Sequence, residues 1–246
     1  MKTLLKALDL LEYISTRDGE AVSPKKAAEK LGINPSSCVR LLQTLTDRGY
    51  LVQISRREGY VCGPALTAYR CRESSCNALA AAAEEPLRTL SRELGGRMIN
   101  LSVAHRDRRY LIFQCGHTPG ARVGDFIGHT WDDLEANATE LLLLAAAPDA
   151  ERLRILRQTK IPKRFSTEKE FLAELDTLHA LRHTVFYSER QAMWIVGGLV
   201  EPPGFPAATL GFGMESRTTA EETLPAVHRC MESILRRLAP PVPFNC

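Results

Sequence analysis

Apolar residues recur every three or four positions at the start of the chain, a spacing that places side chains on one face of a helix. The stripe consists of Leu4, Ala7, Leu8, Leu11 and Ile14. It predicts an amphipathic helix over residues 2–16, with Leu5 and Leu10 off the stripe. Such a face is buried either in the core of a small domain or against a second copy of the chain, and the sequence leaves both open.

Two helix starts follow eleven residues apart, and each combines a polar cap with a proline. Ser23-Pro24 opens a segment that ends before Gly32, and Asn34-Pro35 opens a longer one that ends before Gly49. The cap side chain accepts a hydrogen bond from a free backbone N–H, and proline at the first helical position sacrifices none. Two helices joined by so tight a turn must cross steeply. This predicts a helix-turn-helix whose second helix enters the major groove of DNA.

The second of these helices has an inward apolar stripe and an outward polar face. The stripe is Cys38, Leu41, Leu42 and Leu45, and the opposite face carries Ser36, Ser37, Arg40, Gln43, Thr44 and Asp47. Arginine makes bidentate hydrogen bonds to guanine and glutamine to adenine, while small hydroxyls at the helix start permit close approach to phosphate. With Lys25 and Lys26 nearby, the pattern favours DNA binding over a merely solvated surface.

The hydrophobic pattern changes to alternation from Tyr50 to Ser55, and a second short strand follows over residues 60–62. The turn between them holds Arg56 and Arg57. A hairpin directly after the DNA-binding helix is the wing of a winged helix, and its arginines can contact phosphate or the minor groove. Charge agrees with this assignment, because residues 1–76 hold 12 Lys and Arg against 8 Asp and Glu, whereas the remainder holds 20 against 21.

The remaining two thirds of the chain mix alternating segments with helical ones. Residues 64–94 predict one or two linking helices, broken near Pro86. Strands are predicted over 98–104, 110–115, 184–188, 193–200 and 207–214, and helices over 136–147, 149–158, 167–181 and 224–238. This order predicts an α+β domain with helices on one side of an antiparallel sheet. The long loop over residues 116–134 is expected to be functional.

Composition argues against a membrane protein and against a metal- or disulfide-dependent one. The longest apolar run, Leu141 to Ala147, is far shorter than the roughly 20 residues that span a bilayer. Asp9 and Glu12 interrupt the apolar N-terminus and no small-residue cleavage site follows, so we expect a cytoplasmic protein without a membrane partner. The seven cysteines show no paired C-x-x-C spacing, which predicts free thiols in a reducing compartment, no metal site and no cofactor.

Three segments carry a family resemblance: KALDLLEYI, VSPKKAAEKLGINPSSCVRLLQTLTDRGYLV and GYVCGPAL. Together they resemble the IclR family of bacterial transcription regulators, and a weaker resemblance continues over the whole chain. It implies a winged helix-turn-helix over residues 1–63, a linker helix over 64–82 and a GAF-like effector-binding domain over 83–246. It also implies a regulator of a catabolic or related operon that forms homodimers, which can pair into tetramers. Whether it represses or activates stays open.

The predicted contacts to operator DNA are Lys25, Ser36, Ser37, Arg40, Gln43, Thr44, Arg56 and Arg57. The resemblance further implies effector contacts between the sheet and the segment after its second strand, at Val123, Phe126, Asn137, Ala138, Tyr187, Met193, Ile195, Leu210 and Phe212. Where the family often has Gly-Lys after Ala138, this chain has Thr139 and Glu140.

The last predicted strand departs from the family at the positions that can carry carboxylate-binding serines. Leu210 and Phe212 stand there instead, so we expect a less polar, aromatic or alkyl-bearing acid as the effector. Arg122 and His129 are candidates to meet its carboxylate. The alternative interpretation is that the apolar residues, Leu210 and Phe212 included, simply fill the core.

Two other function classes remain open at this stage. Cys115 with His117 and His129 resembles a thiol nucleophile with a base, but no oxyanion signature or placed acid accompanies them, so we expect no catalytic residues. The thiols could instead serve a redox-sensing regulator, which requires an exposed cysteine of low pKa.

Overall fold

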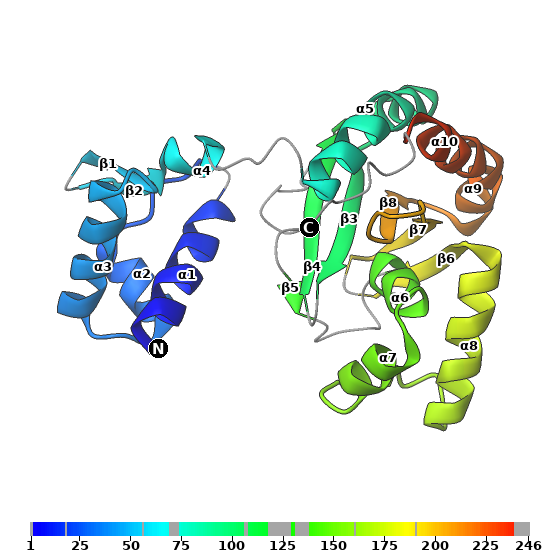
Figure 1. Cartoon of the computed structure of the whole chain (residues 1–246), viewed down its shortest axis with the longest axis horizontal. Coiled ribbons are helices and arrows are strands. Elements are labelled where there is room, and N and C mark those ends of the chain that lie inside the picture. The colour runs from blue at the N-terminus through cyan, green and yellow to red at the C-terminus, as the bar shows by residue number, and fades with distance from the viewer. Residues whose placement is uncertain are drawn as a thin grey trace. The chain divides into compact units, whose positions relative to one another are not determined.

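The structure is a computed structural model of the 246-residue chain (Figure 1). It describes residues 2–17, 19–55, 57–68, 74–105, 108–117, 129–130, 138–159, 161–189 and 191–238. These residues form two compact units, the first holding the described residues up to 68 and the second those from 74 onward. One helix, α5 (Ser75–Glu93), spans residue 82, so the predicted boundary between linker and effector domain stays a prediction.

The first unit is the predicted winged helix-turn-helix. Its elements are α1 (Lys2–Ser15), α2 (Pro24–Leu31), α3 (Pro35–Asp47), β1 (Leu51–Ser55), β2 (Gly59–Cys62) and α4 (Ala65–Ala68). Both predicted caps form, because the Ser23 side chain accepts from the N–H of Lys26 and the Asn34 side chain accepts from that of Ser36. Strands β1 and β2 pair antiparallel as the wing.

The core of the first unit buries only the C-terminal half of α1. Leu10 and Ile14 are buried with residues of α2, α3 and the wing, whereas Leu4 and Leu8 are 64% and 47% exposed. The predicted stripe omitted Leu10. Its first turns are exposed in the single chain because the rest of the unit covers the helix only near its end, so contact with a second copy stays a prediction for them.

The second unit is an α+β fold, as predicted. After α5 its elements are β3 (Ile99–His105), β4 (Arg108–Cys115), β5 (His129–Thr130), α6 (Ala138–Ala145), α7 (Asp149–Leu156), α8 (Glu168–Leu181), β6 (His183–Ser188), β7 (Met193–Val200), β8 (Ala208–Met214), α9 (Arg217–Glu222) and α10 (Leu224–Arg237). The strands form one sheet in the order β5-β4-β3-β8-β7-β6, and every neighbouring pair is antiparallel.

Helices cover both faces of this sheet, and not one face as the sequence predicted (Figure 1). Adjacent strand residues point to opposite faces. A Cβ on Gly197 would lie 2.8 Å from Leu142 of α6, and a Cβ on Gly198 would lie 2.8 Å from Val227 of α10. We call these two sides the α6 face and the α10 face. On the α10 face, one apolar cluster fills the space between the sheet and the two helices α5 and α10. On the α6 face, another fills the space between the sheet and the two helices α6 and α8.

Helix α5 runs unbroken through Pro86, contrary to the predicted break. Proline removes one backbone hydrogen bond from the helix interior. The buried side chains of Leu79, Ala83, Leu87 and Leu90 lie on both sides of Pro86 and pack into the same cluster as the sheet. Tertiary packing along the whole helix therefore outweighs the local helix breaker.

Candidate DNA-contacting face and effector site

Helix α3 presents a polar face to solvent because its apolar stripe is held in the core. Cys38, Leu42 and Leu45 are buried, as predicted. The predicted DNA contacts Ser36, Ser37, Arg40, Gln43 and Thr44 are all exposed on the other side of the helix. Lys25 in the first turn of α2 and Arg57 in the wing turn are exposed as well, while Arg56 lies outside the described residues.

Three side chains on the α3 face form hydrogen bonds that the sequence did not reveal. The Ser36 hydroxyl bonds to Asn34 Oδ1 at 2.7 Å, and the Thr44 hydroxyl donates to the carbonyl of Arg40 at 2.8 Å. The Gln43 amide donates from Nε2 to Asp47 Oδ1 at 2.8 Å. The outward face is thus partly ordered before any partner binds.

A buried polar cluster lies on the α6 face of the second unit. The Arg109 guanidinium is 3% exposed, and its Nε lies 3.3 Å from Glu140 Oε1. Its Nη1 donates to the hydroxyls of Ser102 and Thr139 at 3.2 and 3.5 Å. Burial lowers the pKa of Arg109, and the charge of Glu140 opposes that shift. Sequence reasoning missed Arg109, although Glu140 in place of the family's lysine was a signal for a cationic partner.

The sheet register divides the described effector candidates between the two faces. Ala138 lies at the start of α6, and Met193 and Ile195 share the face of Gly197. Leu210 pairs with Gly198 and Phe212 with Val196, so both point to the α10 face and pack into its apolar cluster. Tyr187 pairs with Trp194 on that same face. The predicted set is therefore not brought together.

This placement favours the core-filling interpretation of Leu210 and Phe212 over their role as apolar pocket walls. On the α6 face, β8 contributes Gly211 and Gly213 instead, whose Cβ positions would meet Thr139 of α6 and Met193 of β7. Three further candidates, Val123, Phe126 and Asn137, lie outside the described residues, as do Arg122 and the side chain of His129.

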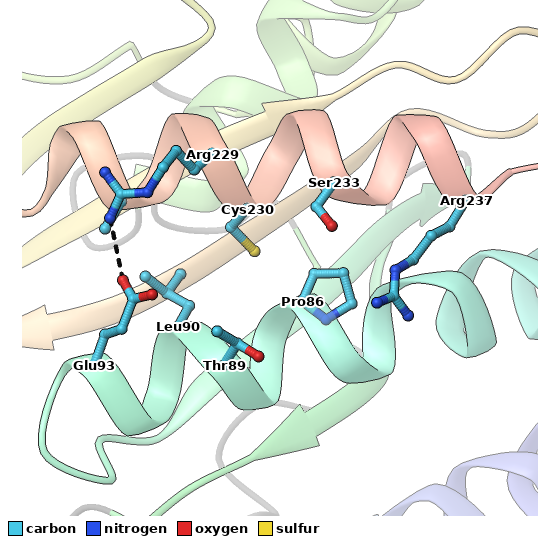
Figure 2. A pocket seen from close by; sticks show the side chains of 9 residues that line it. Pro86, Thr89, Leu90, Glu93, Arg229, Cys230, Ser233 and Arg237 are labelled. Atoms are coloured by element: carbon cyan, nitrogen blue, oxygen red, sulfur yellow. Dashed lines mark hydrogen bonds and ion pairs between the residues drawn. The ribbon is translucent and has the colours of Figure 1, made fainter.

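A shallow groove of about 120 Å³ separates α5 from α10 (Figure 2). Its lining residues are Pro86, Thr89, Leu90, Glu93, Ala226, Arg229, Cys230, Ser233 and Arg237. Arg229 closes one side by an ion pair to Glu93 at 3.2 Å. None of the predicted site residues lines this groove.

Four of the described cysteines differ from what redox or nucleophilic chemistry requires. Burial raises the pKa of the Cys38, Cys62 and Cys115 thiols, and it raises the pKa of Cys230 to about 12. A raised pKa disfavours the reactive thiolate. In the described part of the chain, no three His, Cys, Asp or Glu side chains gather into a group suited to a metal ion. No helix in that part is long and apolar enough to cross a membrane.

A winged helix-turn-helix joined to an antiparallel α+β unit defines a class of DNA-binding regulators, and comparison with known proteins agrees with this class. The IclR helix-turn-helix domain matches residues 3–55. The HTH-type transcriptional regulator Rv1719 of Mycobacterium tuberculosis is 27% identical over 184 residues, covering 74% of this chain and 68% of that protein.

Solved structures show the same fold over the whole chain. An IclR homolog from Microbacterium hydrocarbonoxydans, complexed with 4-hydroxybenzoate, has a TM-score of 0.77 at 15% identity, covering 96% of this chain and 98% of that one. An IclR transcriptional regulator from Alicyclobacillus acidocaldarius has a TM-score of 0.72 at 19% identity, with the same coverage. Residues 3–55 thus carry an IclR helix-turn-helix domain, as the sequence predicted, and the chain shares its fold with solved IclR regulators over 96% of its length.

Proposed function

We propose that this regulator binds operator DNA through the exposed face of α3 and the wing, and that its second unit binds a small organic acid that controls this binding. The α3 face carries the proposal, because Ser36, Ser37, Arg40, Gln43 and Thr44 are all exposed on one helix whose other side is held in the core. These residue types form the hydrogen bonds to phosphates and base edges that operator recognition needs.

Arg40 is the sharpest test of the DNA-binding face. Replacing one bidentate base contact is expected to cost about 1–3 kcal/mol of discrimination at one base pair. Arg40→Ala should therefore relax specificity there when affinities for matched and mismatched duplexes are measured at fixed salt. Arg48→Ala is the matched control, because Arg48 follows α3 and is exposed but was not assigned to a base. Equal specificity in wild type and Arg40→Ala would contradict the assignment.

We further propose that the chain acts as a homodimer. Leu4, Leu5 and Leu8 on α1 are largely exposed in the single chain, and a second copy would cover them. A two-fold dimer places two α3 helices in successive major grooves, so operator half-sites about one helical turn or a multiple apart are expected. Pairing of dimers into tetramers stays a prediction.

The effector site is proposed to lie on the α6 face, at Ala138, Met193 and Ile195. Ile195 is only 6% exposed yet belongs to neither apolar cluster of the described residues, as expected for a wall of a separate site. A relative of the same fold was crystallised with 4-hydroxybenzoate, which supports an acid with an aromatic or alkyl body. Binding sites of this kind are mostly apolar with few polar groups.

A thermal-shift titration tests this site. A ligand at about 100 times its Kd stabilises the folded state by about 2.7 kcal/mol and so raises the Tm. At equal concentration, aromatic acids such as 4-hydroxybenzoate are therefore expected to raise the Tm more than two-carbon acids such as glyoxylate, which should bind less tightly. Ile195→Ala should reduce the ligand-induced shift. Val196→Ala, its neighbour on the α10 face, should lower the Tm of the free protein but retain the shift. Tighter binding of the two-carbon acids would overturn the proposed ligand class.

A further inference from the structure

Two features of α3 go beyond the predicted set of DNA contacts: the bond between Gln43 and Asp47, and the exposed side chain of Val39. We infer that α3 recognises an A·T base pair. Gln43, positioned by Asp47, contacts the adenine edge, and Val39 contacts the C5 methyl of thymine. This inference rests on the proposed DNA-binding function, and it names the base-pair chemistry of that surface.

The Gln43–Asp47 bond fixes the orientation of the glutamine amide. A carboxylate only accepts hydrogen bonds, so the amide nitrogen of Gln43 must face Asp47 Oδ1, which lies 2.8 Å away. The amide oxygen and the second N–H then remain for a partner. Adenine presents the matching pair in the major groove, an acceptor at N7 and a donor at N6. Since Gln43 is already held, less side-chain entropy is lost when the base contact forms.

The position of Asp47 is otherwise unfavourable, which supports a positioning role. It is the last residue of α3 and exposed, and a negative charge at a helix C-terminus opposes the helix dipole. A carboxylate on a surface that faces DNA is also repelled by phosphate. Neither helix stability nor general DNA attraction therefore accounts for an aspartate here, whereas orientation of Gln43 does.

Val39 supplies the apolar half of the same recognition surface. It lies one helical turn before Gln43, so the two side chains are neighbours on the helix surface. Its side chain is exposed while Cys38 beside it is fully buried. An exposed aliphatic residue between polar ones fits the thymine methyl, the one apolar group that a base pair presents in the major groove.

The experiment starts with the full-length wild-type protein, which is used to enrich bound duplexes from a pool with a randomised central segment. Affinities of the enriched operator and its single-base variants are then measured at fixed salt for wild type, Asp47→Ala, Asp47→Asn and Val39→Ala. Wild type should prefer adenine at one position by about 5- to 150-fold, and Asp47→Ala should lose most of that preference. Asp47→Asn retains an acceptor oxygen and should keep it.

Replacing the paired thymine by deoxyuridine tests Val39. Loss of one methyl contact should weaken DNA binding by wild type about fourfold, the value expected for the burial of one CH₂-sized group. The affinity of Val39→Ala should be the same for the thymine and deoxyuridine duplexes. Equal melting temperatures of the variants, all at exposed positions, will show that folding is retained.

The outcomes separate this inference from the function on which it rests. If wild type enriches no sequence, sequence-specific DNA binding itself is refuted. If an operator is enriched but Asp47→Ala and Asp47→Asn both raise affinity for all duplexes without changing base preference, Asp47 acts only through its charge and the positioning role is overturned. An enriched operator whose Asp47-dependent or Val39-dependent position is not A·T overturns the inference in the same way.

Discussion

The buried pair of Arg109 and Glu140 allows a sharp test of the packing between α6 and the sheet. The perturbation is Glu140→Gln, which keeps the size of the side chain and removes its charge. Among the described residues, the guanidinium of Arg109 would then have only neutral partners, namely the new amide at position 140 and the hydroxyls of Ser102 and Thr139.

The expected cost follows from the burial of both partners. Their side chains are 3% and 7% exposed, so water cannot solvate the charge that remains. Removing one member of a buried ion pair costs about 3–5 kcal/mol, which for a unit of this size corresponds to a fall in Tm of roughly 6–20 °C. The matched control is Glu221→Gln, because the Arg217–Glu221 pair is exposed at both ends and should contribute no more than about 1 kcal/mol.

Urea unfolding followed by tryptophan fluorescence reports on the unfolding of the second unit. The two tryptophans of the chain are Trp131 and Trp194, so none lies in the sequence of the winged helix. The double variant Arg109→Met with Glu140→Leu should recover most of the lost stability, since well-packed apolar residues often replace a buried ion pair without cost. A loss of stability in Glu140→Gln no greater than that in Glu221→Gln would refute the expected cost of the unpaired Arg109.

Two further predictions concern the α10 face. Burial and the neighbouring His183 lower the pKa of His228, so the folded state resists protonation of its ring. The contribution of His228 to the free energy of unfolding is therefore fully present above its unfolded pKa of about 6.5, and it is lost as the pH falls through its lower folded pKa. The variant His228→Gln should therefore lose less stability than wild type between pH 7.5 and 5. Gly198→Ala should lower stability by about 1–3 kcal/mol in urea, because its Cβ would lie 2.8 Å from Val227 and Met231. Parallel stability–pH profiles of wild type and His228→Gln would contradict the first prediction. An unchanged urea midpoint in Gly198→Ala would contradict the second.

The sequence predicted best the features that depend on local chemistry. The caps at Ser23 and Asn34 mark the starts of α2 and α3, and the wing follows where alternation begins. These signals act within a few residues, so they can be recognised without knowing the tertiary fold. The unbroken α5 shows the limit of local signals, because the proline rule is overridden by packing on both sides of Pro86.

Face assignment in the second unit could not be predicted in the same way. A period of two shows that Leu210 and Phe212 share one face of β8, but it does not show which helix covers that face. The register with β7 decides this, because Leu210 pairs with Gly198 on the α10 face. Arg109 was missed for a similar reason, since Glu140 is about 30 residues away along the chain and the pair forms only when α6 packs on the sheet.

The exposed leucines of α1 show how the same ambiguity bears on assembly. A hydrophobic stripe indicates that a helix face is covered, but it does not say whether the same chain or a second copy covers it. The single chain covers Leu10 and Ile14 and leaves the N-terminal leucines open. Lys2 and Lys6 stand in the first half of α1, and Asp9 and Glu12 in the second. Two copies packed antiparallel about a two-fold axis would therefore place opposite charges beside a shared leucine contact, which is the self-complementary arrangement that an isologous dimer requires.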